Sequence, residues 1–454
     1  MSSPTTSTPS PPPEIWRLIF RFATTSQAAY AIDYLPFQPV QEFQETNSSL
    51  EEEALRLQTC LALVLVSRSF RDVAVEFLYE DVKIYHARGL ASFMSGLSSS
   101  AAAASRAEGS SSYGSYVRRL EVPHRRSTFS STNPHHQHHS PFPTHPIPCD
   151  PSAPSLSDIL LLCPRLQILV RPCLRLDAES IAFWASLVRT PVVASLTHLM
   201  RLEWHESELD SRFYGFNNTL RLRELVSQAP NLRYLFLSSD RQNSLADLCL
   251  PSSLRTLRIN RSNFHSTPPS SSASRKPLLK SRCHAPHPGA IPNFRNLVLH
   301  TTLPASLLSF VSAVGQHLRV LELAFAPQMI FSSNQMQRLL ASCPVLEELV
   351  YALGAPEISS LPLDAPSSVK RVRLKINPDE WNPCKPVLRT QLGLLEGPSF
   401  PELREVILHD SSRWLMRREV GREAVGRMLK RGWVVRYEHD EGGANVALPV
   451  PVPT

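Results

Sequence analysis

The side chains of this chain that could carry out chemistry do not complete a catalytic or metal-binding pattern. His205-Glu206, followed by Glu208, begins like a zinc-protease helix, but the second histidine of that pattern is missing. The run His135-His136-Gln137-His138-His139 offers imidazole nitrogens that could bind a metal ion. Because this run stands in a Pro- and Ser-rich stretch that does not fix a coordination geometry, we expect no structured metal site there.

Motifs for nucleotide binding and for nucleophilic catalysis are absent as well. The sequence contains no Gly-x-Gly-x-x-Gly, no Walker-type loop and no Gly-x-Ser-x-Gly. Only 15 residues of 454 are Gly, while 40 are Pro. Folds that hold phosphates need Gly where the backbone approaches the ligand closely. We therefore expect that the protein is not an enzyme and uses no cofactor.

The cysteines give no metal or disulfide framework. The chain has 8 of them, and no two form a Cys-x-x-Cys pair. We expect small buried thiols in a reducing compartment. The N-terminus lacks the pattern of a signal peptide, and the longest aliphatic run, Leu61–Val66, is far too short to span a membrane. These features predict a soluble protein of the cytoplasm, the nucleus or both, without a membrane partner.

Positive charge is spread along the chain rather than gathered on one element. The formal net charge is +7, whereas nucleic-acid-binding proteins concentrate basic residues on one face. The basic loop from Arg275 to Arg282 lies in a Ser/Pro-rich stretch without apolar periodicity, which is typical of a solvated insertion. We therefore do not expect nucleic acid as a partner.

A short phrase recurs along the chain and indicates a repeat architecture. Apolar residues at helical spacing lead into Cys163-Pro164-Arg165-Leu166, Ala229-Pro230-Asn231-Leu232 and Cys343-Pro344-Val345-Leu346. The Pro disfavours helix at the residue before it, and each phrase is followed by a short alternating strand pattern. A second phrase, Pro251-Ser252-Ser253-Leu254, returns as Pro366-Ser367-Ser368-Val369. Helix, stop and strand in repetition are typical of a solenoid.

Strand patterns with apolar residues at positions one, four and six occur throughout this region. They begin at Leu166, Leu199, Leu232, Leu254, Phe294, Leu318, Leu346, Val369 and Leu403, at spacings of 22 to 40 residues. Only the first departs at its sixth position, where Arg171 stands. The shorter spacings are those of leucine-rich repeats. The predicted fold class is α/β, with an irregular leucine-rich-repeat solenoid over 156–440, a disordered insertion at 265–293 and a tail at 441–454.

The N-terminal third of the chain is predicted to be partly helical. Residues 1–10 are expected to be disordered. A helix beginning near Pro12-Pro13 carries one apolar face formed by Ile15, Leu18, Ile19 and Phe22. An inserted loop at 26–48 precedes a capping box at Ser49 to Glu52 and two further helices. Residues 86–155 are expected to be flexible linkers around one strand.

Three stretches of the N-terminal region form a recognisable pattern: Pro12-Pro13-Glu14-Ile15, Val66-Ser67-Arg68-Ser69-Phe70-Arg71 and Leu78-Tyr79. With this pattern residues 11–85 resemble an F-box, and the whole chain resembles fungal-type F-box proteins with degenerate leucine-rich repeats. Two departures stand out. The opening Leu of the family is replaced by Pro11 or Ser10, and the loop at 26–48 separates the first helix from the second.

The resemblance implies a partner and a set of contact residues. F-box helices bind the Skp adaptor and through it a cullin scaffold, and the repeats then present a target protein for ubiquitination. The implied adaptor-binding residues are Pro13, Ile15, Ile19, Leu63, Val66, Arg68 and Phe70. A three-helix unit this short has little room for a core, so it should leave an apolar face that needs a partner.

The strand pattern suggests where a target would bind. In a solenoid of parallel strands, the residues between the core positions point to solvent on the strand face. The candidate target-binding residues are Arg233, Arg255, Arg319, Glu322 and Arg373. The predicted function is therefore a substrate-recognition subunit of an SCF-type ubiquitin ligase. The alternative is a repeat scaffold for protein–protein interaction that has no coupling to a ubiquitin ligase.

Overall fold

The computed structural model describes 11–24, 31–37, 47–84, 87–107, 111–122, 156–171, 196–206, 218–239, 248–260, 291–300, 305–323, 333–352, 368–376, 385–398, 400–410, 414–438 and 446–447. The predicted disordered N-terminus (1–10), residues 123–155 of the predicted linker and residues 265–290 of the predicted insertion lie outside these residues. The chain divides into two compact units. The first contains Met1–Ile32 and Pro39–Glu224, and the second contains Asp33–Gln38 and Leu225–Thr454.

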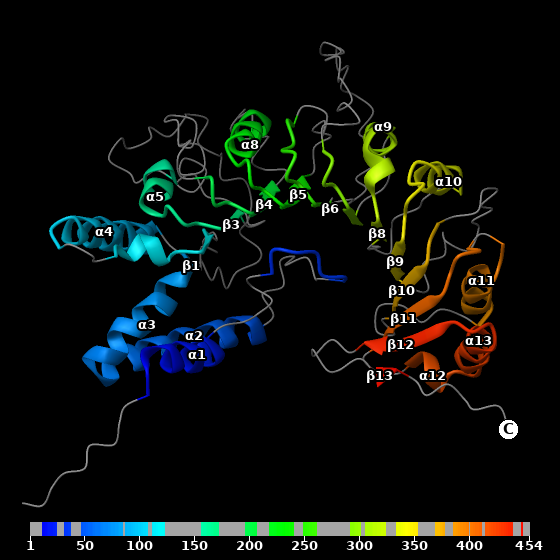
Figure 1. The fold of residues 1–454 in the computed structure, drawn as a ribbon, viewed down its shortest axis with the longest axis horizontal. Coiled ribbons are helices and arrows are strands. Elements are labelled where there is room, and N and C mark those ends of the chain that lie inside the picture. Colours follow the sequence, from blue (N-terminus) through cyan, green and yellow to red (C-terminus); the bar gives the residue numbers. More distant parts are fainter. Residues whose placement is uncertain are drawn as a thin grey trace, which may run out of the picture. The chain divides into compact units, whose positions relative to one another are not determined.

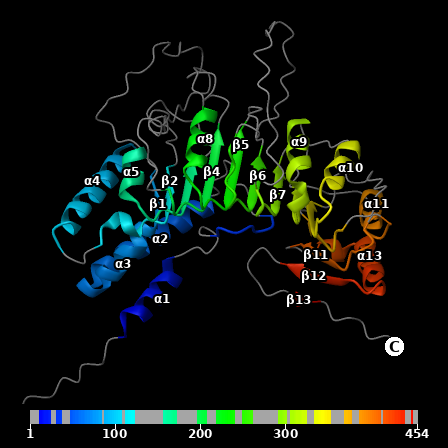
Figure 2. The ribbon, with the colours of Figure 1, turned by 45° about the horizontal axis from the view of Figure 1, so that its top comes forward.

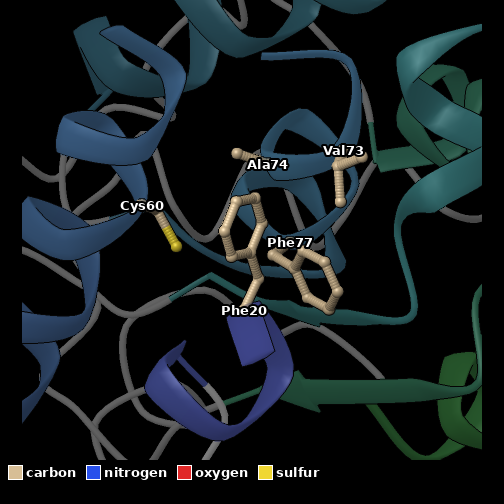
Figure 3. Packing of buried hydrophobic residues seen from close by; sticks show 5 residues of the cluster. All are labelled: Phe20, Cys60, Val73, Ala74 and Phe77. Atoms are coloured by element: carbon tan, nitrogen blue, oxygen red, sulfur yellow. The ribbon is translucent and has the colours of Figure 1, made fainter. Parts of the chain in front are cut away.

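The first unit begins with a small helical core. Helices α1 (Pro13–Thr24), α2 (Asn47–Val66) and α3 (Arg68–Glu80) enclose the buried side chains of Phe20, Cys60, Val73, Ala74 and Phe77 (Figure 3). The aromatic rings pack edge to face, with 5.2 Å between the ring centres of Phe20 and Phe70. Helix α3 begins where the Ser67 hydroxyl accepts a hydrogen bond of 3.1 Å from the Phe70 N–H.

The remainder of the first unit is built from parallel strands. Strands β1 (Asp81–Lys83), β2 (Arg119–Glu121), β3 (Ile168–Arg171) and β4 (Arg201–Glu206) pair in chain order. Helix α4 (Ala87–Ala104) and the 3₁₀ turn η2 (Tyr113–Tyr116) connect β1 to β2, and α5 (Leu156–Leu162) precedes β3.

These elements differ from the predicted linker at 86–155. The part of this region that forms α4 is rich in Ser and Ala. It is helical because Ala has the highest helix propensity and because Leu90 and Leu97 are buried on one side of α4. Because β1 and β2 already belong to the parallel series, the strand repeats begin before the predicted boundary at residue 156.

The second unit continues with eight parallel strands in chain order and a short antiparallel one. The strands are β5 (Tyr234–Ser239), β6 (Thr256–Asn260), β7 (Asn296–His300), β8 (Val320–Leu323), β9 (Glu348–Ala352), β10 (Arg371–Lys375), β11 (Glu405–His409), β12 (Val434–Glu438) and β13 (Val446–Ala447). The helices are α8 (Asn218–Ser227, at the boundary of the units), α9 (Ala305–Val314), α10 (Ser333–Ala341), α11 (Lys385–Leu395), α12 (Trp414–Arg417) and α13 (Glu419–Lys430), with a 3₁₀ turn η6 (Gly315–His317). Helices α9, α10, α11 and α13 lie along one side of the strands (Figures 1 and 2).

The strand register confirms the predicted core positions. The second residue of each strand from β5 to β12 is aligned with that of its neighbours: Leu235, Leu257, Leu297, Leu321, Leu349, Val372, Val406 and Val435. All of these side chains are buried. The predicted patterns at 166 to 403 all become strands, but each strand starts two residues after the first apolar position. That first residue lies in the preceding turn.

The same turn precedes most strands. In each case the N–H of the first apolar residue donates to the carbonyl three residues earlier, as from Leu232 to Ala229 (3.1 Å) and from Leu346 to Cys343 (3.2 Å). In two turns Gly takes the place of the Cys or Ala, because a Cβ would not fit. A Cβ added to Gly114 would lie 1.8 Å from the Leu162 carbonyl oxygen, and one added to Gly315 would lie 2.2 Å from the Ser342 carbonyl oxygen. The turns therefore bring consecutive repeats into close backbone contact.

The described cysteines largely follow the sequence prediction. Cys60, Cys163 and Cys343 are buried free thiols, whereas Cys249 is exposed just before the Pro251 turn. Burial in the apolar turns raises the pKa of Cys163 and of Cys343 to about 12. These two thiols are therefore packing groups rather than nucleophiles.

Three predicted boundaries shift. The insertion ends before residue 291, because Ile291 is buried and its carbonyl accepts from the Phe294 N–H. The predicted loose tail contributes β13, which pairs with β12. In the predicted loop at 26–48, residues 31–37 are described and make defined contacts, and α2 already begins at Asn47.

Candidate protein-binding surfaces

The side of β5–β12 opposite to the helices carries polar side chains. We call it the polar strand face, and it is formed by alternate residues of these strands, beginning with the first. The third residues, aligned from β5 to β12, are Phe236, Arg258, Val298, Glu322, Val350, Arg373, Ile407 and Arg436. Charged and apolar side chains therefore alternate from strand to strand on this face, in contrast to the uniformly apolar core side.

Cross-strand ion pairs tie together the part of this face on β9 to β12. The Glu348 carboxylate accepts from Arg371 at 3.1 Å and from Arg373 at 3.0 Å. The Glu405 carboxylate accepts from Arg371 Nε at 2.6 Å and forms an ion pair with Arg436 Nε at 3.0 Å. Glu348 on β9 therefore pairs with two arginines of β10, and Glu405 on β11 lies between arginines of β10 and β12, so the charges hold one another in a fixed arrangement.

The β6–β8 part of the face contains buried titratable groups. Arg258 Nε donates to His300 Nε2 at 3.0 Å, which requires a neutral imidazole. Burial and the Arg258 charge hold the pKa of His300 well below its ordinary value. Burial raises the pKa of Glu322, and the hydrogen bonds that its carboxylate accepts from Tyr34 (2.6 Å) and the Phe37 N–H (3.2 Å) act in the opposite direction.

The predicted target-binding residues fall into two groups. Glu322 and Arg373 lie on the polar strand face, both at the third position of their strands. Arg233, Arg255 and Arg319 lie in the turns one residue before β5, β6 and β8, where their side chains are exposed. The difference follows from the two-residue shift in where the strands begin. The structure therefore does not bring all of these residues onto one face.

A second candidate surface lies on the helices of the first unit. Large apolar side chains of α1 and α2 are exposed rather than buried: Ile15, Leu18, Ile19 and Phe22 on α1, and Leu55, Leu61, Leu65 and Val66 on α2. Phe22 and Leu65 have the largest exposed fractions of this set, at 83% and 79%. Helix α1 turns its other face, with Trp16 and Phe20, into the core.

The predicted adaptor-binding residues are divided between this surface and the core. Pro13, Ile15, Ile19, Val66 and Arg68 are exposed. Leu63 and Phe70 are half-buried and pack against the cluster around Phe20 and Phe77. The sequence pattern did not distinguish the two sides of α2, so it placed Leu63 in the surface set and left out Leu61 and Leu65, which lie on the exposed side.

The described part of the chain carries neither a metal cluster nor a membrane-spanning helix. Within it, no group of His, Cys, Asp or Glu side chains could hold a metal ion. None of its helices is both long enough and apolar enough to cross a membrane.

Comparison with known proteins gives similarity in structure alone. No family model matches this chain, and no curated protein matches it. The chain is similar to the leucine-rich-repeat-containing protein LegL7 from Legionella pneumophila, with a TM-score of 0.41 and 15% identity over 65% of this chain and 90% of that chain. It is also similar to an internalin (InlF) from Listeria monocytogenes, with a TM-score of 0.25 and 11% identity over 63% and 66% of the two chains.

Proposed function

We propose that this chain is a non-enzymatic substrate-recognition subunit of an SCF-type ubiquitin ligase. In this proposal α1–α3 bind the Skp adaptor, and through it a cullin scaffold, while the polar strand face binds a target protein. The chain would act by proximity, because a bound target is held at high effective concentration near a ubiquitin-charged partner. No side chain of this protein takes part in the transfer itself.

The observation that carries the proposal is the exposed apolar surface of α1 and α2. Ile15 and Ile19 on α1, and Leu61, Leu65 and Val66 on α2, are each at least 44% exposed. Several large apolar side chains exposed on a small helical unit are typical of a protein-binding site. The F-box resemblance of residues 11–85 identifies the adaptor as the partner that would cover it.

The test is the double variant Ile19→Asp/Val66→Asp. Both side chains are exposed in the free chain, so the substitutions should leave folding unchanged. In the complex they would bury unpaired charge, which is costly. We expect binding to the Skp adaptor, measured with the purified full chain, to weaken at least about tenfold, which corresponds to roughly 1.4 kcal/mol.

The matched control is Leu161→Asp/Val345→Asp. These side chains are similarly exposed, at 54% and 44%, but lie on α5 and in the turn before β9. Adaptor binding should be unchanged in this variant. If the wild-type chain does not bind the adaptor, or if both double variants bind as tightly as the wild type, the adaptor assignment is wrong. The chain would then be a repeat scaffold without ubiquitin-ligase coupling.

A further inference from the structure

A segment from the loop between α1 and α2 lies against the polar strand face. Asp33–Gln38 belongs to the second compact unit, although the residues around it belong to the first. The Tyr34 hydroxyl donates to Glu322 Oε2 at 2.6 Å, and the Phe37 N–H donates to the same oxygen at 3.2 Å. Tyr34 and Glu322 are 288 residues apart in the sequence. In Figure 1 this segment lies on the side of β8 and β9 that faces away from α9 and α10.

The backbone at Phe37 adopts a conformation that a bulky residue rarely takes. Its φ is +54°, in the left-handed region. Such a conformation costs of order 1–3 kcal/mol and persists where the surroundings determine it. Here the Phe37 N–H is held by Glu322, and the Phe37 ring lies 5.0 Å from the His409 ring. The polar strand face therefore supplies contacts that fix this turn.

The contacts of the segment involve more than one strand. Glu322 is on β8 and His409 is on β11, with β9 and β10 between them. Tyr34 and Phe37 both contact Glu322, and the Phe37 ring lies against His409. Burial is the largest effect that raises the pKa of the Tyr34 hydroxyl well above its ordinary value, and the Glu322 carboxyl raises it further. Glu348 acts in the same direction, and the positive charge of Arg373 acts in the opposite direction. One short peptide thus contacts side chains from several repeats.

We propose that the polar strand face around Glu322 is a peptide-binding site, that its partner presents a short turn with a tyrosine three residues before a second aromatic residue, and that residues 33–37 occupy this site within the chain itself. A carboxyl oxygen that accepts from both a phenol O–H and a backbone N–H selects Tyr over Phe at the first position. The His409 ring accommodates the second aromatic side chain.

This inference deepens the target-binding half of the proposed function and does not depend on adaptor binding. A fluorescein-labelled peptide with the sequence of residues 30–39 serves as the probe, and fluorescence anisotropy with the full chain gives its Kd. The variant Tyr34→Ala/Phe37→Ala removes the internal competitor. We expect this variant to bind the peptide at least about tenfold more tightly than the wild type does.

A second peptide, with Phe in place of Tyr34, tests the chemistry. We expect it to bind the released variant at least about tenfold more weakly, because a buried hydrogen bond to a carboxyl is lost. Adding Glu322→Ala to the released variant should have a similar effect. Arg319→Ala is the matched control, since Arg319 lies just before the same strand with an exposed side chain, and it should leave the Kd unchanged.

Three results would overturn the inference: equal affinity of the wild type and the released variant, equal affinity for the two peptides, or no binding to the released variant. If the released variant does not fold, the single substitution Tyr34→Phe repeats the comparison, because it removes only the hydroxyl. Adaptor binding is measured on the same proteins. Loss of peptide binding with adaptor binding retained rejects this inference alone, and the reverse result rejects only the adaptor half of the proposed function.

Discussion

Replacing Gly315 by Ala should disrupt the packing between two consecutive repeats. An added Cβ would lie 2.2 Å from the Ser342 carbonyl oxygen, 3.0 Å from its carbon and 3.2 Å from Cys343 Sγ. The first of these contacts involves backbone of the next repeat, which cannot move aside as a flexible side chain would. Overpacking of this kind costs about 1–3 kcal/mol and occasionally more. We therefore expect Gly315→Ala to lower the free energy of unfolding by about that amount.

Gly393 provides a control of opposite sign in the same unit. It lies within α11, and a Cβ added there meets no atom within 4 Å. Because Gly loses more backbone entropy on folding than Ala does, Gly393→Ala should stabilise the chain by about 0.5–1 kcal/mol. The same chemical change is thus predicted to have opposite effects at two positions, and only the tertiary contact distinguishes them.

The assay is urea unfolding of the full chain, followed by circular dichroism and by hydrogen exchange of peptides that contain β8 and β9. Hydrogen exchange is needed because the chain has two compact units, and a single transition does not report on each of them. Exchange in β8 and β9 should accelerate in Gly315→Ala and not in Gly393→Ala. If Gly315→Ala proves neutral or stabilising, the close approach of Gly315 to Ser342 is wrong, and with it the packing of these repeats.

Two further predictions concern the strands. Leu257 is fully buried between Leu235 and Leu297 in the register, so Leu257→Ala should lower the free energy of unfolding in urea by about 2–5 kcal/mol. Arg255→Ala, in the exposed turn before β6, should change it by less than about 0.5 kcal/mol. Similar values for the two variants would contradict the register. Because the pKa of His300 is lower in the folded than in the unfolded chain, the unfolded chain binds a proton first as the pH falls. The stability contributed by neutral His300 is therefore complete above about pH 6.5 and decreases as the pH falls below that value toward the lower folded pKa. His300→Asn, which keeps an acceptor for Arg258, should lose less stability than the wild type when the pH is lowered from 7.5 to 5.5; if both proteins lose the same free energy of unfolding, His300 is not the responsible group.

The strand repeat could be predicted because its signal is local. Apolar residues at alternate positions, and a turn residue before each set, predict both the presence of a strand and the side that is buried. This is why Leu235, Leu257, Leu321 and Leu349 were placed correctly in the core. A local signal also marks the end of α13, since Gly432 follows this helix with φ of +79°, a conformation that Gly adopts readily.

The surfaces were predicted less completely, because exposure depends on what packs alongside. Helix α1 has apolar residues on two sides, and only the packing of Phe20 against Phe77 shows which side remains exposed. On the strands, a shift of two residues placed Arg233, Arg255 and Arg319 in turns rather than on the polar strand face. The Ser/Ala-rich stretch was read as a linker, although buried leucines on one side support it as α4.

The sequence by itself determined the alternation of strand and turn, the apolar core side of each strand and the absence of complete catalytic motifs. These features depend on residues that are close together along the chain. Only the tertiary structure decided that Gly315 must lack a side chain, that Glu348 and Glu405 each pair with two arginines, and that Tyr34 reaches Glu322. Each of these contacts joins residues from different repeats or from distant parts of the chain. Periodicity along a sequence carries no information about which distant groups the folded backbone brings together.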